Sequence, residues 1–312
     1  MNYDIIGDLH GHADQLSQLL EKLGYKKEKG IYQQAGHQAI FVGDFIDREA
    51  QQKAVIDIVR PMIDSKKALA VMGNHEFNAI CYHTKHSERL CGYLRCHTLK
   101  NTEQHEAFLE EYPLARAETN ELIEWFKTLP LFLELDGFRV IHACWDQKII
   151  DDLKQNNRLT EDNCLVGDYY LEASTKGSEL YQAIEVLLKG KEMELPEGIS
   201  FNDKDGKERH EIRIKWWDES LETYQQASVS DIPSLNNFPA INIPKENKIA
   251  GYPNEDKPVF FGHYWFSGEP GILKDNAACL DYSVGNKEKL VCYQWNQGDT
   301  KLSNNNFVMV DA

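Results

Sequence analysis

Short apolar runs alternate with amphipathic stretches through the first third of the chain. The apolar runs at 3–6, 38–42 and 68–72 have the length of buried strands, and apolar side chains at helical spacing follow the first two runs, at 16–23 and 54–62. Because strands that alternate with helices usually form a parallel sheet, this pattern predicts an α/β fold with a largely parallel core.

The pattern becomes more varied after this point. Residues 77–129 have the character of polar helices. The apolar runs at 131–135 and 138–141 flank an Asp-Gly pair, which is a strong signal for a β-hairpin. Further strands are predicted towards the C-terminus, at 258–261, 277–282, 290–295 and 307–310.

The stretch 146–256 has only weak periodicity. It contains a helical segment near 178–189 and a turn rich in Gly, Asp and Lys at 203–207. A chain of 312 residues can form one or two domains. We expect a single domain over 1–312, with 146–256 as an insertion or cap over the functional site rather than a second domain.

Side chains that can bind metal ions follow several of the predicted strands. In chain order they are Asp8, His10, Asp44, Asn74, His142 and His263. In sheets of this type, ligand sites lie beyond the carboxyl ends of the strands. Each of these residues taken singly would more often be a turn residue or a packed polar side chain. Five strand ends that carry such residues in order favour a functional site instead.

These side chains can be divided between two divalent ions that share a bridging carboxylate, about 3.5–4 Å apart. Asp8 and His10 would bind one ion, and Asp44 would bridge. The other ion would take the last three side chains of the set, Asn74, His142 and His263. Because no thiolate is among the ligands, we expect manganese, with iron, zinc or nickel as alternatives.

Charge and composition exclude other classes of protein. The 34 Lys and Arg residues against 50 Asp and Glu residues give a net charge of −16, which argues against non-specific nucleic-acid binding and membrane-surface binding. No apolar run approaches the roughly 18 residues of a membrane-spanning helix. The N-terminus has no features of a secretion signal, so a cytoplasmic protein is expected.

The seven cysteines are scattered and odd in number, which predicts reduced thiols rather than a disulfide framework. None has an arginine six positions later, so the Cys-x5-Arg loop of cysteine-dependent phosphatases is absent, and no P-loop is present either. One cluster lacks the spacing of a zinc site and is expected to be helical: Cys81, His83, His86, Cys91, Cys96 and His97.

Three segments at the strand ends resemble the signature blocks of the calcineurin-like metallophosphoesterases. They are GDLHG at 7–11, GDFIDR at 43–48 and GNHE at 73–76. The blocks around His142 and His263 resemble the two later histidine blocks of that family. Trp265 stands where the wider superfamily has the second histidine of Gly-His-x-His, which is similar to the phosphoprotein-phosphatase branch.

The resemblance implies a β-sandwich flanked by helices (αββα) with a helical insertion or cap. In that family, hydroxide held between two metal ions attacks phosphorus in line. By resemblance, His75 is the general acid and Asp47 orients it. Arg48 resembles the phosphate-binding arginine, and Arg213 resembles an arginine of bacterial dinucleoside-tetraphosphatase relatives, with an exposed strand arginine as an equal alternative. Glu49 replaces the usual glycine, so the phosphate loop could differ.

The sequence favours a phosphomonoesterase of the protein serine/threonine or tyrosine phosphatase type, because Asp47 has the form found in that branch. A symmetrical dinucleoside polyphosphate (diadenosine tetraphosphate) hydrolase is the alternative, supported by 124–130, 142–146 and 261–265. An inactive phosphate-binding module is a remote third reading, since no ligand is missing. The substrate would be a phosphoprotein or a nucleotide, and the tryptophans at 216–217 are expected to pack in the core or cap.

Overall fold

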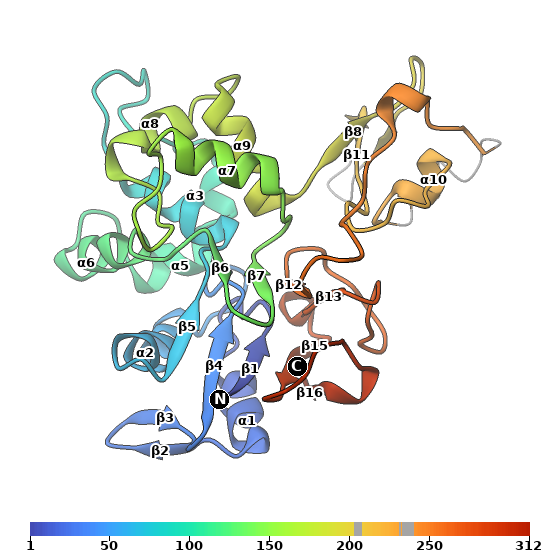
Figure 1. The fold of residues 1–312 in the computed structure, drawn as a ribbon. Coiled ribbons are helices and arrows are strands. Elements are labelled where there is room, and N and C mark those ends of the chain that lie inside the picture. The colour runs from blue at the N-terminus through green and yellow to red at the C-terminus, as the bar shows by residue number, and fades with distance from the viewer. Residues whose placement is uncertain (203–207, 231, 233–239) are drawn as a thin grey trace.

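Two β-sheets face each other in the structure, a computed structural model that describes residues 1–202, 208–230, 232 and 240–312 (Figure 1). The first sheet has the strand order β14-β15-β1-β4-β5, and β16 pairs with β15. Its strands are β1 (Asn2–Ile6), β4 (His37–Phe41), β5 (Ala68–Ala70), β14 (Asp281–Tyr282), β15 (Lys289–Trp295) and β16 (Phe307–Asp311). β1, β4 and β5 are parallel, as the alternating pattern predicted, whereas β15 is antiparallel to β1.

The second sheet has the strand order β13-β12-β7-β6. Its strands are β6 (Phe132–Glu134), β7 (Arg139–Ile141), β12 (Val259–Phe261) and β13 (Ala277–Cys279). β6 and β7 form the predicted hairpin, in which the amide of Leu135 donates to the carbonyl of Phe138 at 2.9 Å. β12 is parallel to both β7 and β13.

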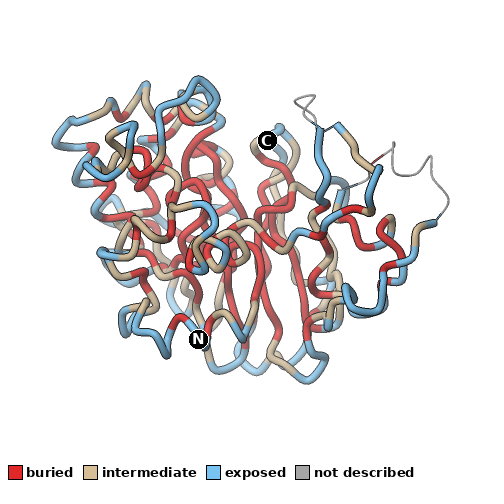
Figure 2. The backbone as a smooth tube through the Cα atoms, turned by 90° about the horizontal axis from the view of Figure 1, so that it is seen from above, coloured by how far each residue is buried: buried red, intermediate tan, exposed pale blue. Residues whose placement is uncertain are grey.

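The inner faces of the two sheets share one buried apolar cluster. Ile5 and Ile40 of the first sheet and Phe260 of the second are fully buried in it. Because successive strand residues point to opposite faces, the neighbouring Ile6 and Phe41 belong instead to the cluster that includes the helices. Figure 2 shows the buried segments concentrated along the strands. The predicted sandwich flanked by helices is thereby confirmed.

The predicted strand at 277–282 is divided between the two sheets. β13 ends at Cys279 in the second sheet, and β14 begins at Asp281 in the first. The carbonyl oxygen of Leu280, between them, lies 2.0 Å from where a Cβ on Gly7 would be. The chain therefore crosses from one sheet to the other over a residue that has no side chain.

Helices cover the outer faces of the sandwich. α1 (Ala13–Leu23) contacts β15 and β16, and α2 (Gln52–Asp64) contacts β5. α1 buries the predicted leucine face and ends at Gly24, whose φ of 95° suits a residue without a Cβ. The next helices along the chain are α3 (Asn74–His83), α4 (Leu99–Glu103), α5 (Glu106–Glu111) and α6 (Ala117–Phe126). β2 (Lys26–Glu28) and β3 (Ile31–Gln33) form a small antiparallel hairpin.

The segment 146–256 consists of two structurally different parts. The first part is helical and packs into the main core through α7 (Gln147–Gln155), α8 (Tyr170–Ala173) and α9 (Glu179–Lys189). α9 confirms the helix predicted near 178–189. The second part contains β8 (Glu192–Glu194), β9 (Phe201–Asn202), β10 (Glu208–Arg209), β11 (Glu211–Arg213) and α10 (Tyr224–Ala227).

This second part has a small apolar core of its own, which includes Met193, Ile212 and Tyr224. Figure 1 shows it on the right, apart from α7, α8 and α9. The segment is therefore mainly helical in its first part, whereas its second part combines short strands with the short helix α10. The turn predicted at 203–207 lies outside the described residues. None of the helices within the described ranges is long and apolar enough to cross a membrane.

The loop after α3 corrects two predictions. α3 ends at His83, so the helix does not continue through the cysteine- and histidine-containing segment that follows. Cys91 and Cys96 form a disulfide instead of remaining reduced, because the loop brings their Cα atoms to 5.5 Å. The other five cysteines are free and buried, as expected for reduced thiols.

Candidate active site

The six side chains predicted to bind metal ions converge at one end of the sandwich. They follow β1, β4, β5, β7 and β12, and in chain order they are Asp8, His10, Asp44, Asn74, His142 and His263. None of them is more than 7% exposed. Strands of both sheets therefore deliver ligand-type side chains to the same edge, as expected for sites beyond the carboxyl ends of strands.

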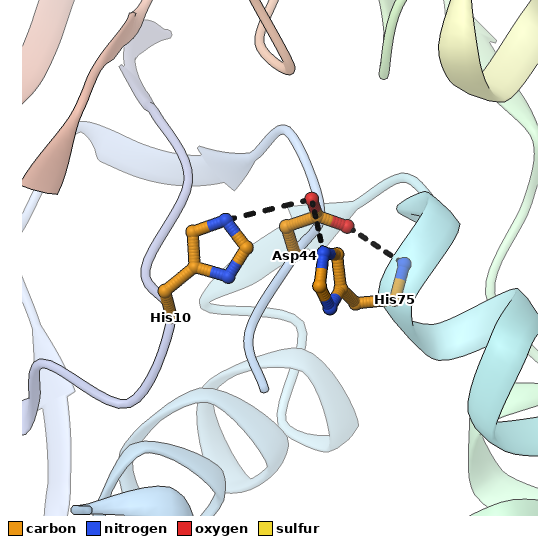
Figure 3. A group of neighbouring side chains, drawn as sticks. All are labelled: His10, Asp44 and His75. Carbon is orange, nitrogen blue, oxygen red and sulfur yellow. Dashed lines mark hydrogen bonds and ion pairs between the residues drawn. The ribbon is translucent and has the colours of Figure 1, made fainter. Parts of the chain in front are cut away.

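Asp44 lies at the centre of this cluster. Its Oδ2 atom is 3.6 Å from Nε2 of His10, 3.4 Å from Nε2 of His142 and 3.9 Å from Nε2 of His75. Its Oδ1 atom accepts a hydrogen bond from the backbone amide of His75 at 2.9 Å (Figure 3). Two groups of possible ligand atoms, each within 4.8 Å of one another, share Asp44: one adds His10 and His75, and the other adds His142 and His263. A carboxylate in this position can bridge two ions.

Unpartnered buried atoms show that the cluster fits metal ions. Within the described residues, Oδ1 of Asp8, Nε2 of His10 and Nε2 of His263 are buried without a hydrogen-bond partner. Buried polar atoms are normally paired, so three such atoms around one carboxylate need an explanation. Carboxylate oxygens and imidazole nitrogens are ligands for manganese, iron and zinc, and a cation would satisfy all three.

Backbone carbonyls orient two of the imidazoles. Nδ1 of His10 donates to the carbonyl of Ile46 at 3.0 Å, and Nδ1 of His142 donates to the carbonyl of Val42 at 2.8 Å. These bonds turn both Nε2 atoms towards Asp44. Such support from the far nitrogen is the usual arrangement for histidines that bind metals.

The charges of the site agree with this assignment. Burial and the carboxylates of Asp281 and Asp44 raise the pKa of Asp8 well above its usual value, because negative charges are crowded together. Burial and the neighbouring His75 lower the pKa of His10 to about 3, so its imidazole is neutral at pH 7. Neutral imidazole is the form that binds a metal ion.

The backbone of the strand-end loops is held in unusual conformations. His10, Asp44 and His263 have φ values of 44°, 51° and 74°, in the left-handed region that non-glycine residues rarely adopt. A Cβ on Gly262 would lie 2.0 Å from Oδ1 of Asp8. Strained backbone and close approaches of this kind are concentrated at functional sites, where they aim side chains back over the edge of the sheet.

Glu76 is a structural member of the site to which the sequence assigned no role. It is fully buried, and its carboxylate accepts from the amides of Asp44 at 2.9 Å, Phe45 at 2.8 Å and Gly73 at 3.0 Å. Burial, with the nearby Asp44 charge, raises its pKa to about 7. The residue ties the loop after β4 to the start of α3. Its position in the GNHE block was the sequence signal that could have indicated a role at the site.

His75 and Asp47 form a buried pair beside the cluster of predicted metal-binding side chains. Nδ1 of His75 lies 2.5 Å from Oδ2 of Asp47, while Nδ1 of His105 lies 2.7 Å from its Oδ1. Nε2 of His105 in turn lies 3.1 Å from Nε2 of His83. The sequence predicted the first pair and missed His105, which is 58 residues from Asp47 and lies in a polar stretch with no motif.

Burial opposes charge on both members of the pair, but the neighbouring charged and hydrogen-bonded groups outweigh burial for each. Burial lowers the pKa of His75, yet Asp44 and Asp47 raise this pKa above its usual value overall. Burial raises the pKa of Asp47, yet His105 and His75 hold it well below its usual value. Asp47 is therefore an ionised acceptor, and both facing imidazole nitrogens donate to it.

A cleft of about 1320 Å³ opens over the cluster of predicted metal-binding side chains. Side chains of α3 and α9 line one part of it, and side chains of β9, β10 and β11 line another. Both predicted arginines lie on this cleft. The Arg48 guanidinium lies 4.7 Å from the ring centroid of Trp265, and Nε of Arg213 lies 3.9 Å from Glu192.

Trp265 is the tryptophan that lines the cleft. Trp216 and Trp217 are each only 3% exposed and pack against Phe261, and Nε1 of Trp216 donates to the carbonyl of Ala143 at 3.0 Å. The prediction that this pair packs in the interior is confirmed.

Facing sheets with helices outside, and a cluster of Asp, Asn and His residues at their common edge, define a metallophosphoesterase. Residues 1–219 match the family model described as calcineurin-like phosphoesterase, and the chain belongs to that family. It is a hydrolase of this class. The resemblance inferred from the three sequence blocks is confirmed.

Named relatives narrow the comparison further. The chain is 30% identical over 188 residues to bis(5'-nucleosyl)-tetraphosphatase PrpE [asymmetrical] of Oceanobacillus iheyensis, a match that covers 58% of this chain and 70% of the relative. It is 30% identical over 138 residues to the symmetrical bis(5'-nucleosyl)-tetraphosphatase of Janthinobacterium, covering 44% of this chain and 42% of that protein.

A solved structure supports the fold. A serine/threonine phosphatase from Saccharomyces cerevisiae aligns with a TM-score of 0.51 over 100% of this chain and 79% of that chain, at 12% identity. The alignment shows that the two proteins share a fold.

Proposed function

We propose that this protein is a metal-dependent hydrolase of dinucleoside polyphosphates. The observation that carries the hydrolytic part is the buried cluster around Asp44, with the His75–Asp47 pair at its side. In this proposal Asp8 and His10 bind one divalent ion. Asn74, His142 and His263 bind the other, and Asp44 bridges the two. When bound, such ions lower the pKa of water and neutralise charge on the phosphoryl group; manganese is the ion we propose.

His75 supplies the proton for the leaving oxygen. Its Nδ1 is held by Asp47 at 2.5 Å, so its Nε2 is the nitrogen that remains for substrate. Because its pKa is raised by Asp44 and Asp47 in spite of burial, the imidazole can carry a proton near pH 7. As water attacks phosphorus and releases a proton to solvent, the bond from phosphorus to the leaving oxygen breaks, and that oxygen takes the proton from His75.

Two arginines hold the phosphoryl oxygens in this proposal. Arg48 follows Asp47 directly and lines the cleft, and its planar guanidinium can bond two oxygens at once. Arg213 lines the same cleft from β11. We therefore propose that 146–256, which carries Arg213, acts as a cap within a single unit that spans 1–312.

The charge of the cleft favours a polyanionic substrate. Five acidic side chains line it in the described part of the chain, and two of these, Asp44 and Asp47, belong to the catalytic cluster. Seven cationic side chains of the same described residues line it: Arg48, Arg95, Lys100, Lys176, Lys189, Arg209 and Arg213. In a chain of net charge −16, such a concentration of cations favours binding of several phosphate groups. The relatives named as bis(5'-nucleosyl)-tetraphosphatases support the same class of substrate, which a cytoplasmic enzyme would meet.

A phosphomonoesterase of the phosphoprotein type is the second candidate. The specific observation in its favour is Asp47, which contacts His75 in the form expected from the phosphoprotein-phosphatase branch. A phosphoserine or phosphotyrosine side chain would place one phosphoryl group on the metal cluster and leave most of the cationic cleft unused.

One side-by-side assay distinguishes the two. Enzyme loaded with Mn²⁺ is tested against diadenosine tetraphosphate, phosphoserine and phosphotyrosine peptides, and p-nitrophenyl phosphate, with Asp44→Asn as the inactive control. We expect kcat/KM to be highest for diadenosine tetraphosphate. A higher value for a phosphopeptide would select the second candidate, and turnover of none would contradict both.

A further inference from the structure

Arg95 is a partly buried cation of the cleft that the mechanism above does not use. It lies in the loop closed by the Cys91–Cys96 disulfide. Its Nη2 atom donates to Oδ1 of Asn101 at 3.1 Å and to Oε1 of Gln104 at 3.0 Å. Both partners are neutral amides, and no carboxylate in the described ranges contacts the guanidinium.

An arginine oriented by amides is prepared to bind an anion. The bonds to Asn101 and Gln104 fix one edge of the planar guanidinium without neutralising its charge. Burial lowers the pKa of Arg95 from its usual value, and the more distant carboxylates of Asp47 and Glu185 only partly oppose this shift. Lys100 and Lys176 line the same cleft and add to its positive potential.

Two consecutive residues contact Arg95 on one side and the His75–Asp47 pair on the other. Gln104 contacts Arg95, and the next residue, His105, donates to Asp47, which in turn holds His75. Arg95 is therefore connected to the general acid through consecutive residues. Because His75 protonates the leaving oxygen, the part of the substrate nearest Arg95 is the leaving group.

We propose that Arg95 binds a phosphoryl group of the departing nucleotide. This inference rests on the proposed dinucleoside polyphosphate hydrolysis and adds a second anion site to it. The metal cluster and Arg48 would hold the phosphoryl group that is attacked, while Arg95 holds one on the far side of the bond that breaks. A leaving group without phosphate, such as p-nitrophenol, makes no use of the second site.

Inhibition by a free nucleotide that carries several phosphate groups tests the proposal directly. ATP is used as a competitive inhibitor of p-nitrophenyl phosphate hydrolysis at a fixed free Mn²⁺ concentration, in wild type, Arg95→Gln and Arg116→Gln. Arg116 is an exposed arginine that does not line the cleft, so its variant controls for the loss of one positive charge. A bond from arginine to phosphate predicts that Arg95→Gln raises the Ki of ATP about tenfold or more. Arg116→Gln should leave it unchanged.

Orthophosphate provides the second arm, since it binds only where the attacked group binds. In Arg95→Gln, the Ki of orthophosphate should change far less than the Ki of ATP. The kcat/KM for p-nitrophenyl phosphate should also change far less than the Ki of ATP. Arg95→Lys retains the charge and loses the planar fork, so it should give an intermediate Ki for ATP. This variant keeps the test valid if Arg95→Gln fails to fold.

Each outcome is decisive for one proposal or the other. Equal changes in both inhibition constants, or absence of ATP inhibition in wild type, would overturn the role of Arg95 even if diadenosine tetraphosphate is a substrate. A selective loss of ATP binding in an enzyme that does not cleave diadenosine tetraphosphate would support the second site and contradict the proposed function. Measurements of Ki for ATP and orthophosphate in these four proteins therefore test the inference separately.

Discussion

The imidazole of His75 donates from Nδ1 to Oδ2 of Asp47 over 2.5 Å. The second oxygen of the same carboxylate is occupied by His105 at 2.7 Å, so Asp47 is held from both sides. A general acid must keep one fixed orientation towards the leaving group. If His75 is the general acid, as proposed, that orientation depends on a histidine from a distant part of the chain.

Replacing His75 should separate proton transfer from metal binding. We expect His75→Asn to retain both ions and to lower kcat by ~10²–10⁴, the usual contribution of a general acid. The loss should be large for a phosphoserine peptide or diadenosine tetraphosphate and small for p-nitrophenyl phosphate, whose leaving group needs no proton. Asp47→Asn should show a milder form of this pattern. Equal losses on all substrates, or loss of metal in elemental analysis, would remove His75 from the acid role.

Removal of metal should abolish activity. Exhaustive chelation is expected to stop turnover, and added Mn²⁺ should restore it, because Asp8, His10, Asp44, Asn74, His142 and His263 have no hydrolytic power alone. Asp44→Asn should be more damaging than His10→Ala, since Asp44 belongs to both groups of possible ligands. The measurement is metal content and kcat for both variants. Full activity in metal-free protein would contradict the two-metal proposal.

Gly262→Ala should displace a metal ligand without touching the chemistry. The new Cβ would lie 2.0 Å from Oδ1 of Asp8, so the carboxylate must move. We expect reduced metal content and activity, with metal restored only at higher Mn²⁺ concentration. Gly167→Ala is the matched control, because no heavy atom lies within 4 Å of its added Cβ among the described residues. Unchanged metal affinity in Gly262→Ala would contradict the role given to Asp8.

Glu76→Ala should destabilise the whole edge of the sandwich. The change leaves the amides of Asp44, Phe45 and Gly73 buried without their acceptor, and each such amide costs ~1–3 kcal/mol. We expect a fall in the free energy of unfolding of several kcal/mol together with weaker metal binding. Glu76→Gln retains one acceptor oxygen and should lose less. Urea unfolding with excess chelator measures the effect on stability without the contribution of metal binding. Equal stability of wild type, Glu76→Ala and Glu76→Gln would contradict the structural role of Glu76.

Asp146 should stabilise the fold only when ionised. Burial raises its pKa, but Lys191, at 2.7 Å, and the amide of Ile149 lower it below the usual value overall. Its contribution is therefore present above the unfolded-state pKa near 3.8 and is lost as the pH falls through the lower folded-state pKa. Asp146→Asn keeps an N-cap acceptor but loses the ion pair with Lys191, so it should cost up to about 1 kcal/mol at pH 7. The difference from wild type should shrink at more acidic pH, whereas the exposed Asp151→Asn should cost little at either pH.

Local pattern was sufficient for much of the fold and the candidate metal cluster. The apolar runs at 3–6, 38–42 and 68–72 predicted β1, β4 and β5, because strand periodicity and the polar residue that ends each run are local properties of the chain. The residues that follow these runs converge because carboxyl ends of parallel strands meet at one edge. The roles of His75 and Asp47, which lie in two different short blocks, were accessible through the family resemblance alone.

Tertiary structure decided the contacts between segments that share no local signal. His105 reaches Asp47 across 58 residues, and the disulfide between Cys91 and Cys96 depends on how the loop after α3 turns. The strand predicted at 277–282 changes sheets at Leu280, because the chain can pass over Gly7 there, and its apolar pattern is the same in either sheet. Periodicity reports which face of an element is buried, but not what buries it. The partners of a catalytic group and the path of the chain between sheets therefore follow only from packing in three dimensions.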